Sequence, residues 1–415
     1  MIMQDNEKKP ALRFKGFTDP WEQRKLGDAF ERVVRKNTNN ESRLPLTISA
    51  QDGLVDQITY FNNRVASRDV SNYYLVYNGE FAYNKSTSDG YPFGAVKRLD
   101  WYEKGVLSTL YIVFALKHPE KDDSDFMTVF YDTDRWHRGV AERAAEGARN
   151  HGLLNISADD FFDIDTTMPE DKVEQEKIGR LLKKLDTLIT LHQRKYEKLV
   201  NIKKSMLDKM FPPNGASVPE IRFKGFTDPW EQRKISELAE KTYGGGTPTT
   251  SNEAFWNGNI PWIQSSDIVD GKLMGVEPRK YITQTGLNSS ATQLVPKDSI
   301  AIITRVGVGK LAYMPFSYST SQDFLSLSKL NTEPFFTVYA CYKKLQSELN
   351  TVQGTSIKGI TKDELLAKTI SVPVYSEQKQ IGSFFIQLDT LITLHQRKLE
   401  KLQNIKKSCL EKMFV

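Results

Sequence analysis

The chain has 415 residues, of which 39% are hydrophobic and 26% charged, and its formal net charge is +5. The composition is that of a soluble globular protein with two or three domains, and the mild positive charge permits a polyanionic partner without requiring one. Two distant cysteines, Cys341 and Cys409, argue against a disulfide scaffold and a zinc site and fit a reducing compartment.

The N-terminus is polar and has no apolar core, so no signal peptide is predicted. No stretch approaches the roughly 18 apolar residues that a membrane span needs. We therefore expect a cytoplasmic protein without membrane contact.

The chain begins with a segment that occurs twice. Residues 13–25 and 222–234 both read RFKGFTDPWEQRK, 209 positions apart. Aromatic residues in both copies are expected to anchor packing: Phe17, Trp21, Phe226 and Trp230.

A block of mixed secondary structure follows each copy. In the first block, apolar runs predict strands at 44–49, 72–77 and 106–116 and a helix from about Phe126 to Arg149. In the second block, they predict strands at 259–264, 299–314 and 323–330 and a helix at 335–353. Strands followed by a helix in both blocks predict an α+β fold.

A short capped turn closes each block. Ser157 with Asp160 and Thr361 with Glu364 form sequences like a capping box, although Asp replaces Glu in the first. A proline follows each turn, and a long helix is predicted after it.

The two predicted long helices are nearly identical. Residues 185–211 and 388–414 match at 23 of 27 positions, and apolar residues recur at intervals of three and four, as in a coiled coil. At 1.5 Å per residue, a helix of 38 residues is about 57 Å long. We expect the two helices to pack antiparallel, because repeated interfaces tend to close symmetrically.

His192 and His395 occupy equivalent seam positions near the middle of these helices. They are interpreted as polar residues that set the register of the coiled coil, and a metal or catalytic pair is the alternative.

The chain therefore carries two copies of one plan with different contents. The repeated segments and the long helices, which together we call the frame, are almost unchanged between the copies. The blocks share little sequence. The predicted parts are an N-terminal repeated segment (1–25), block one (26–169), a central long helix (170–212), a linker with the second repeated segment (213–234), block two (235–373) and a C-terminal long helix (374–415).

This plan resembles the specificity (S) subunit, HsdS, of type I restriction–modification systems. GGGTPTTSNEAFWNGNIPWIQSSDI, TRVGVGKLAYM and GTSIKGITKDELLAKTISVPV resemble one branch of the family's target-recognition domains, and GYPFGAVKRL resembles another. The resemblance covers essentially the whole chain.

The resemblance implies two α/β target-recognition domains in a pseudo-two-fold arrangement, separated by two long antiparallel coiled-coil helices. Each domain would read half of an asymmetric, bipartite site in double-stranded DNA. The helices would set the spacer and dock two methyltransferase (M) subunits, which recruit restriction (R) subunits for defence against foreign DNA. The chain itself would be non-catalytic and hold no cofactor: S-adenosylmethionine would bind the methyltransferase subunit, and ATP and Mg the restriction subunit.

Candidate DNA-binding residues are polar, aromatic and basic residues, most of them in loops, because such side chains reach base edges and phosphates. In block one these are Asn84, Lys85, Ser86, Tyr91 and Lys97, with Arg143 and Arg149 as phosphate contacts. In block two they are Thr247, Thr249, Gln264, Ser265, Arg305 and Lys310.

Two other functional classes stay open. One is an enzyme with an unrecognised site, although GVGK at 307–310 lacks the Walker spacing, and the acidic run at 160–165 aligns with a structural turn. The other is a coiled-coil adaptor that binds only protein. DNA binding by the assembled complex, with its dependence on salt, discriminates the adaptor from a DNA reader.

Overall fold

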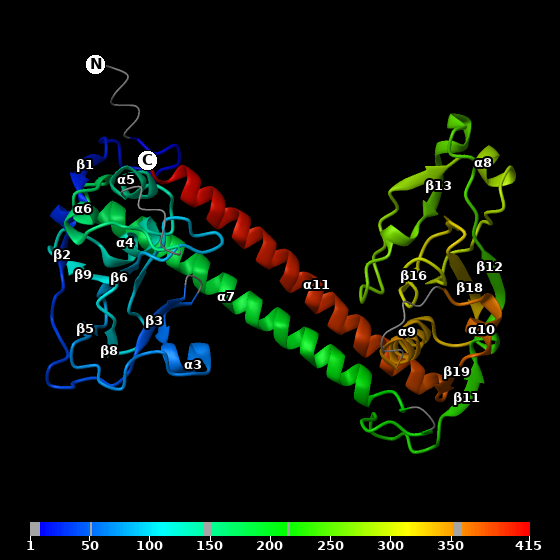
Figure 1. The fold of residues 1–415 in the computed structure, drawn as a ribbon. Coiled ribbons are helices and arrows are strands. Elements are labelled where there is room, and N and C mark those ends of the chain that lie inside the picture. Colours follow the sequence, from blue (N-terminus) through cyan, green and yellow to red (C-terminus); the bar gives the residue numbers. More distant parts are fainter. Residues whose placement is uncertain (1–8, 50–51, 145–151, 214–215, 352–358) are drawn as a thin grey trace. The chain divides into compact units, whose positions relative to one another are not determined.

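The protein forms two compact units joined by long helices (Figure 1). Unit 1 comprises residues 1–192 and 398–415, and unit 2 comprises residues 193–397. Helices α7 (Lys172–Lys209) and α11 (Tyr375–Lys412), each of 38 residues, contribute to both units. The computed structural model describes residues 9–49, 52–144, 152–213, 216–351 and 359–415.

Unit 1 has a four-stranded antiparallel sheet in the order β2-β9-β6-β7 and three two-stranded ribbons, β1-β10, β3-β4 and β5-β8. The strands are β1 (Glu22–Lys25), β2 (Phe30–Arg32), β3 (Leu46–Ser49), β4 (Gly53–Asp56), β5 (Tyr74–Tyr77), β6 (Phe81–Asn84), β7 (Ala95–Arg98), β8 (Lys104–Leu107), β9 (Ile112–Leu116) and β10 (Asp165–Met168). The short helices are α2 (Leu26–Ala29), α3 (Gln57–Phe61), α4 (Ser124–Phe130), α5 (His137–Arg143) and α6 (Ala158–Phe162).

Unit 2 has a four-stranded antiparallel sheet in the order β12-β18-β15-β16, a three-stranded sheet in the order β14-β13-β17 and a ribbon, β11-β19. The strands are β11 (Glu231–Lys234), β12 (Ala239–Gly244), β13 (Trp256–Ile263), β14 (Lys280–Ile282), β15 (Ser299–Ile303), β16 (Leu311–Met314), β17 (Ser319–Thr320), β18 (Phe324–Leu330) and β19 (Thr369–Val372). The helices are α8 (Gln284–Asn288), α9 (Pro334–Thr351) and α10 (Lys362–Ala367), with short 3-10 turns η1 (Ile235–Glu237), η2 (Glu253–Phe255) and η3 (Ser265–Asp267).

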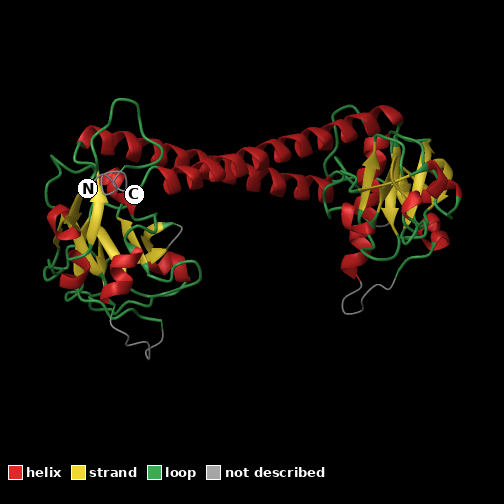
Figure 2. Cartoon of the chain, turned by 90° about the horizontal axis from the view of Figure 1, so that it is seen from above, coloured by secondary structure: helices red, strands yellow, loops and turns green. Residues whose placement is uncertain are grey.

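The long helices run antiparallel within each unit. In unit 1, Lys406 near the end of α11 pairs with Asp186 of α7 at 2.7 Å. In unit 2, Lys203 near the end of α7 pairs with Asp389 of α11 at 2.6 Å. The two ion pairs are equivalent under the sequence repeat, so the helices keep one register in both units. Figure 2 shows a part of α7 beside a part of α11 within each unit.

The same register locates the two histidines. It places His192 level with Glu400 in unit 1 and His395 level with Glu197 in unit 2, and both histidines are half-buried. Among the described residues, no group of three or more His, Cys, Asp and Glu side chains could hold a metal ion. A polar position opposite a glutamate fits the interpretation that these histidines set the register.

Each repeated segment is joined to its unit by a backbone ribbon and a buried ion pair. Its EQRK sequence forms β1 or β11 and pairs antiparallel with β10 or β19, the strand after the capped turn. Arg13 makes a bidentate contact with Glu174 in unit 1, and Arg222 makes the same contact with Glu377 in unit 2, at 2.6–2.8 Å. Both glutamates lie in the first turn of a long helix and are buried.

In each unit, the variable block contacts the frame at the start of a block helix, α4 in unit 1 and α9 in unit 2. In unit 1, the Asp123 carboxylate accepts a hydrogen bond from the backbone amide of Phe126 at 2.7 Å and caps α4. The Asp123 amide donates to the Gln175 side chain of α7 at 2.8 Å. In unit 2, Glu333 and Gln378 repeat these contacts at the start of α9. An acidic cap thus connects each variable block to a repeated glutamine.

A helical glycine permits this close approach. Gly179 of α7 faces the backbone amide of Phe126, and a Cβ added there would lie 2.6 Å from that nitrogen. Gly382 of α11 is in the equivalent position, where a Cβ would lie 2.5 Å from a Glu333 carboxylate oxygen. Any larger residue would push the block helix away from the long helix.

Aromatic packing completes the frame in both units. In unit 1, Trp21 packs edge-on against Phe126 and against Phe414, which follows α11. In unit 2, Trp230 packs in the same manner against Phe336 and Phe211. The two tryptophans are therefore packing anchors, as predicted, and they join the repeated segment, the block and the end of a long helix.

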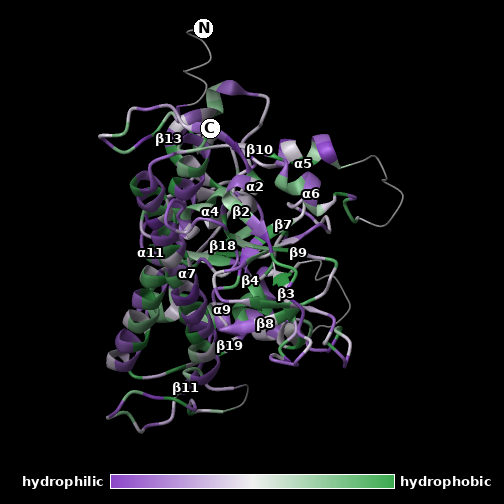
Figure 3. Cartoon of the chain, turned by 90° about the vertical axis from the view of Figure 1, so that its left-hand side faces the viewer, coloured by the Kyte–Doolittle hydropathy of each residue, from purple (hydrophilic) through white to green (hydrophobic). Residues whose placement is uncertain are grey.

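In each block, the four-stranded sheet has a hydrophobic core on both faces, and unit 1 has a further small cluster around Val70, Leu75 and Val106. In both blocks, one face of the four-stranded sheet packs towards the frame, and the other face lies under further strands. The ribbons of α7 and α11 alternate between hydrophilic and hydrophobic residues, as expected for helices with one buried seam (Figure 3). No helix in the described part of the chain is long and apolar enough to span a membrane.

The predicted fold class is confirmed, but several predicted elements are divided. The helix expected from Phe126 to Arg149 ends at Phe130, where Thr133 turns back to bond the Phe130 carbonyl, and α5 begins at His137; residues 145–149 lie outside the described residues. The expected strand at 299–314 is a hairpin with a turn at 304–310, which contains two glycines with positive φ. The GVGK sequence therefore lies in a β-turn region and not before a helix, as a phosphate-binding loop would.

Candidate nucleic-acid interface

The loops of block two converge on one edge of its four-stranded sheet. In the antiparallel pairing, Gly244 at the end of β12 faces Leu325, Ile303 at the end of β15 faces Phe324, and Ile302 faces Leu311. The ends of β12 and β15 and the starts of β18 and β16 therefore lie together. We call this the loop edge of unit 2, formed by residues 245–249, 264–267, 304–310 and 321–323.

Hydrogen bonds tie the separate loops of this edge to one another. The Thr247 hydroxyl donates to the Gln322 side-chain oxygen at 2.7 Å. The Ser321 amide donates to the Ile263 carbonyl at 2.9 Å and so brings the end of β13 to the same place. The Thr304 amide donates to the Asp323 carbonyl at 2.7 Å. The edge is thus one surface built from four chain segments.

All of the residues predicted in block two lie on the loop edge of unit 2. Thr247, Thr249 and Arg305 are exposed, and the other three are half-buried. The Thr249 carbonyl accepts a bond from the Trp256 indole at 3.2 Å, which fixes the end of that loop. The half-buried residues are Gln264, Ser265 and Lys310.

A group of basic and aromatic residues that was not predicted from the sequence lies beside this edge. Lys280 begins β14, which pairs with the end of β13, and Arg279 directly precedes this strand. The Lys280 ammonium lies 5.8 Å from the ring centroids of both Trp256 and Trp262. Gln322 is exposed on the edge itself. The adjacent basic pair in PRK at 278–280 is the signal that could have indicated Arg279 and Lys280.

In unit 1, the structure brings together four of the predicted residues. Asn84 ends β6, and Lys85, Ser86 and Tyr91 lie in the connection from β6 to β7. The Lys85 ammonium donates to the Ile156 carbonyl at 3.3 Å. The connection is held to the segment before α6, since the Thr87 amide donates to the Gly152 carbonyl at 2.6 Å. We call residues 84–94 the loop edge of unit 1.

Lys97 and Arg143 have internal partners. Lys97, in β7, pairs with Asp132 at 2.9 Å. Arg143, at the end of α5, pairs with Asp163 at 2.9 Å and also donates to its backbone carbonyl. Arg149 lies outside the described residues. The structure does not place Lys97 and Arg143 in the β6–β7 connection, and their contact with DNA stays a prediction.

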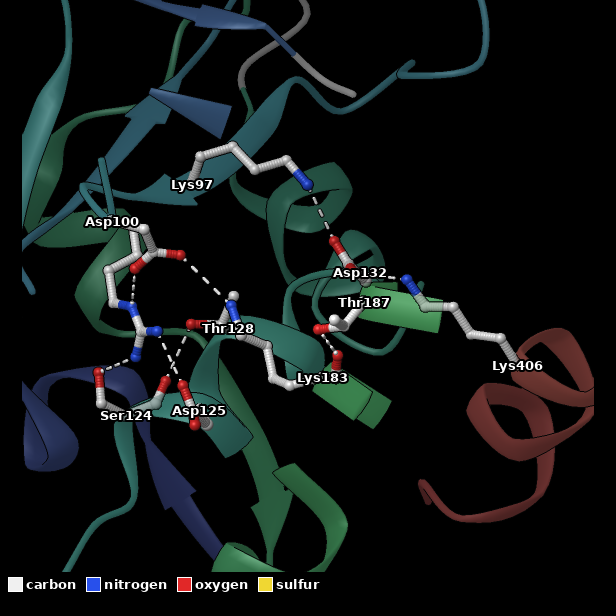
Figure 4. A network of polar contacts seen from close by, with 10 residues as sticks. Lys97, Asp100, Ser124, Asp125, Thr128, Asp132, Lys183, Thr187 and Lys406 are labelled. Carbon is white, nitrogen blue, oxygen red and sulfur yellow. Dashed lines mark hydrogen bonds and ion pairs between the residues drawn. The ribbon is translucent and has the colours of Figure 1, made fainter. Parts of the chain in front are cut away.

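Asp132 joins the sheet of unit 1 to α11 (Figure 4). Its second oxygen accepts from Lys406 at 3.2 Å. Burial acts to raise the pKa of Asp132, but the ammonium groups of Lys97 and Lys406 outweigh it and hold the pKa below its usual value. A lowered carboxyl pKa stabilises the fold above the ordinary pKa of the group, and this contribution is lost as the pH falls through the lowered value.

A second network in Figure 4 holds the start of α4 beside α7. The Arg98 guanidinium pairs with Asp100 at 2.6 Å and with Asp125 at 2.7 Å. Lys183 of α7 contacts the other oxygen of Asp100 at 3.3 Å. These charges neutralise one another within unit 1, so this part of the block serves packing and leaves the loop edge as the candidate DNA surface.

Comparisons with known proteins find one matching family model and several similar proteins. Residues 227–404 match the family described as "Type I restriction modification DNA specificity domain". The specificity subunit of the type I restriction enzyme EcoR124I/EcoR124II from Escherichia coli is 30% identical over 169 residues, 39% of this chain and 41% of that subunit. The MjaIX specificity subunit from Methanocaldococcus jannaschii is 26% identical over 193 residues, 45% of this chain and 44% of that subunit.

These two alignments span less than half of either relative. The putative MjaX specificity subunit from the same archaeon is 21% identical over 406 residues, 94% of this chain and 91% of the relative. A crystal structure of the type I restriction–modification S subunit from M. genitalium has a TM-score of 0.59 at 15% identity and covers 98% of this chain and 99% of its own. The likeness to that structure extends to the whole fold.

Proposed function

We propose that this chain belongs to the family of type I restriction–modification specificity subunits, whose DNA specificity domain matches residues 227–404, and that it is the DNA-recognition subunit of such a complex. Each variable block reads one half of a bipartite DNA site through its loop edge. The frame holds the two blocks and binds the subunits that carry catalysis. The chain itself supplies recognition, and the chemistry belongs to its partners.

The observation that carries this proposal is the convergence of loops in unit 2. Four chain segments meet at one sheet edge and present hydroxyl, amide and basic side chains together. Such groups donate and accept hydrogen bonds with base edges and phosphates. An adaptor that binds only protein has no need of a polar edge on each block.

The two loop edges differ in sequence, whereas the frames repeat contact by contact. Arg13 and Arg222 bind equivalent glutamates, and Gly179 and Gly382 admit equivalent block helices. Like frames with unlike edges support recognition of two different half-sites. We therefore propose an asymmetric target, with a spacer set by the paired long helices.

The repeated helices also offer two like surfaces for two like partners. Leu191 in unit 1 and Leu394 in unit 2 are equivalent residues of the identical sequence LDTLITLHQRK and are 45% and 43% exposed. We propose that each binds one methyltransferase subunit, and that restriction subunits join through these. S-adenosylmethionine would then bind the methyltransferase subunit, and ATP and Mg the restriction subunit.

The test of recognition is genome-wide methylation mapping in cells that carry this chain with a cognate methyltransferase subunit. We expect one asymmetric motif in two parts. Exchange of residues 235–373 for the block of another family member should change one half, and exchange of residues 26–169 should change the other. The spacer should stay constant in both exchanges, since the helices are untouched.

Three results would count against the proposal. A complex that assembles but leaves no new methylated motif would identify the chain as a protein adaptor. A change in both halves after one exchange would show that the blocks do not read independently. Nuclease or methyltransferase activity of the purified chain alone would assign it to the enzymes.

Substitution of the exposed leucines tests the docking surfaces. Leu191→Ser and Leu394→Ser should each weaken the binding of one methyltransferase subunit by about tenfold or more, since a buried apolar anchor contributes over 1 kcal/mol. Native mass spectrometry would then record one tightly bound subunit in each single variant and none in the double variant. Lys184→Ser and Gln387→Ser, equivalent exposed positions on the same helices, are the controls. Two retained subunits in the double variant would exclude this surface.

A further inference from the structure

Among the residues that the structure describes, Asp267 and Ser266 hold the Arg279 side chain of unit 2 in one orientation. Its Nε donates to an Asp267 carboxylate oxygen at 2.5 Å, and one Nη donates to the Ser266 hydroxyl at 2.7 Å. The Asp267 side chain is fully buried, whereas the Arg279 side chain remains 58% exposed. A buried carboxylate thus fixes the orientation of an exposed arginine.

The acid is itself fixed. The second carboxylate oxygen of Asp267 accepts a hydrogen bond from the backbone amide of Gln264 at 2.9 Å, and Asp267 belongs to η3, directly after β13. Both oxygens are therefore engaged, and the carboxylate cannot turn without losing a bond. The guanidinium group is therefore held in a fixed position relative to the end of β13.

The free side of the guanidinium faces away from these partners. A guanidinium has five N–H donors, and the two bonds to Asp267 and Ser266 leave about three for a ligand. The free donors include the two terminal nitrogens, whose spacing matches the O6 and N7 acceptors of guanine in the major groove. The same planar fork fits no other base edge as well.

The neighbouring charge separates base reading from phosphate binding. The ion pair of Arg279 and Asp267 carries no net charge, so it adds little to the long-range attraction that drives phosphate contacts. The directional donors remain. An arginine that only binds phosphate depends on its charge. Such a residue gains nothing from a buried carboxylate that fixes its orientation.

We propose that Arg279 is a specificity-determining residue that reads a guanine in the half-site recognised by unit 2. The inference rests on the proposed function of the chain as a DNA reader. Arg279 lies beside the loop edge of unit 2, because β14 pairs with the end of β13, from which Gln264 and Ser265 continue. Its contact is therefore part of the same readout surface.

The test uses the complex of the full chain with its methyltransferase subunit. The wild-type motif is mapped first, and methylation rates are then measured on duplexes in which each base pair of the motif is replaced in turn. Wild-type complex should discriminate against replacement of one G·C pair in the half-site of unit 2. Arg279→Ala should reduce that discrimination about ten- to hundredfold and leave the other positions and the spacer unchanged.

Arg279→Lys separates geometry from charge. It keeps the positive charge but lacks the fork, so it should fail to restore discrimination. Arg233→Ala is the matched control, because Arg233 is likewise a partly exposed arginine paired with an acidic residue, Glu231. Arg233 lies in the repeated segment and not at a loop edge. Its motif should be that of the wild type.

The outcomes distinguish this inference from the proposed function. A wild-type motif without a G·C pair in that half, or an unchanged motif in Arg279→Ala and Arg279→Lys, overturns the inference and leaves DNA recognition intact. A uniform loss of affinity on all duplexes that lysine rescues assigns Arg279 to a phosphate. Absence of any motif with wild-type complex refutes the proposed function itself.

Discussion

Arg222→Ala is expected to lower the free energy of unfolding of unit 2 by about 3–5 kcal/mol, the usual cost of leaving a buried charge without its partner. The Glu377 side chain is fully buried, and its two oxygens accept from Arg222 at 2.7 and 2.8 Å. Without the guanidinium, the carboxylate must be buried unpaired or take up a proton. Either response weakens the junction between the repeated segment and α11.

Chemical denaturation, monitored by hydrogen exchange of amides in each unit, would measure this change in the free energy of unfolding. Unit 1 keeps the equivalent Arg13–Glu174 pair and serves as an internal reference in the same molecule. Arg233→Ala removes an exposed pair with Glu231 and should cost less than about 1 kcal/mol.

Replacing both partners of the buried pair is expected to recover most of the loss. In the double variant Arg222→Met with Glu377→Leu, no charge is left buried, and apolar side chains of similar volume can fill the space. If Arg222→Ala is as stable as Arg233→Ala, the buried pair does not hold the frame together.

Gly179→Ala should destabilise unit 1 by about 2–3 kcal/mol, although alanine is normally preferred to glycine within a helix by about 1 kcal/mol. The added Cβ would lie 2.6 Å from the amide nitrogen of Phe126 and 2.9 Å from an Asp123 carboxylate oxygen. The closer atom belongs to the backbone, so α4 itself must move. The expected sign is therefore opposite to that of helix propensity.

Exchange of the α4 amides, Ser124–Phe130, would report this displacement directly. Faster exchange confined to α4 and its contacts is expected in Gly179→Ala. Lys184→Ala, an exposed position one and a half turns later in α7, is the control and should change stability by no more than about 0.5 kcal/mol. A Gly179→Ala variant that is more stable than wild type would contradict the close packing of α4 on α7.

The frame could be predicted from the sequence because its evidence is local or repeated. The long helices follow from the spacing of Leu181, Leu182 and Leu185 and from the absence of proline, and duplication of the pattern predicts their antiparallel packing. The capping boxes at Ser157 and Thr361 could also be predicted, since the two partners of each box lie three residues apart. Local patterns of this kind do not depend on distant contacts.

The sheets and the loop edges could not be predicted in the same way. The register that places Gly244 beside Leu325 joins residues that are far apart in the chain, and no short-range pattern indicates it. Lys97 has the sequence context of an exposed loop residue, yet Asp132 and, through it, Lys406 determine where its ammonium points. Arg279 gains its orientation from Asp267 and Ser266, which lie in another turn of the chain.

The helix-cap junction has a consequence for how a gene with this repeated plan could diversify. Every junction residue on the frame side lies in a repeated position: Gln175 and Gln378, Gly179 and Gly382, Trp21 and Trp230. On the block side, each junction needs an acidic residue followed three positions later by phenylalanine, as Asp123 with Phe126 and Glu333 with Phe336. A crossover within the repeated DNA would therefore exchange an entire variable block and preserve the junction. Under the proposed function, one such recombination event would change the DNA sequence that is recognised and leave the scaffold unchanged.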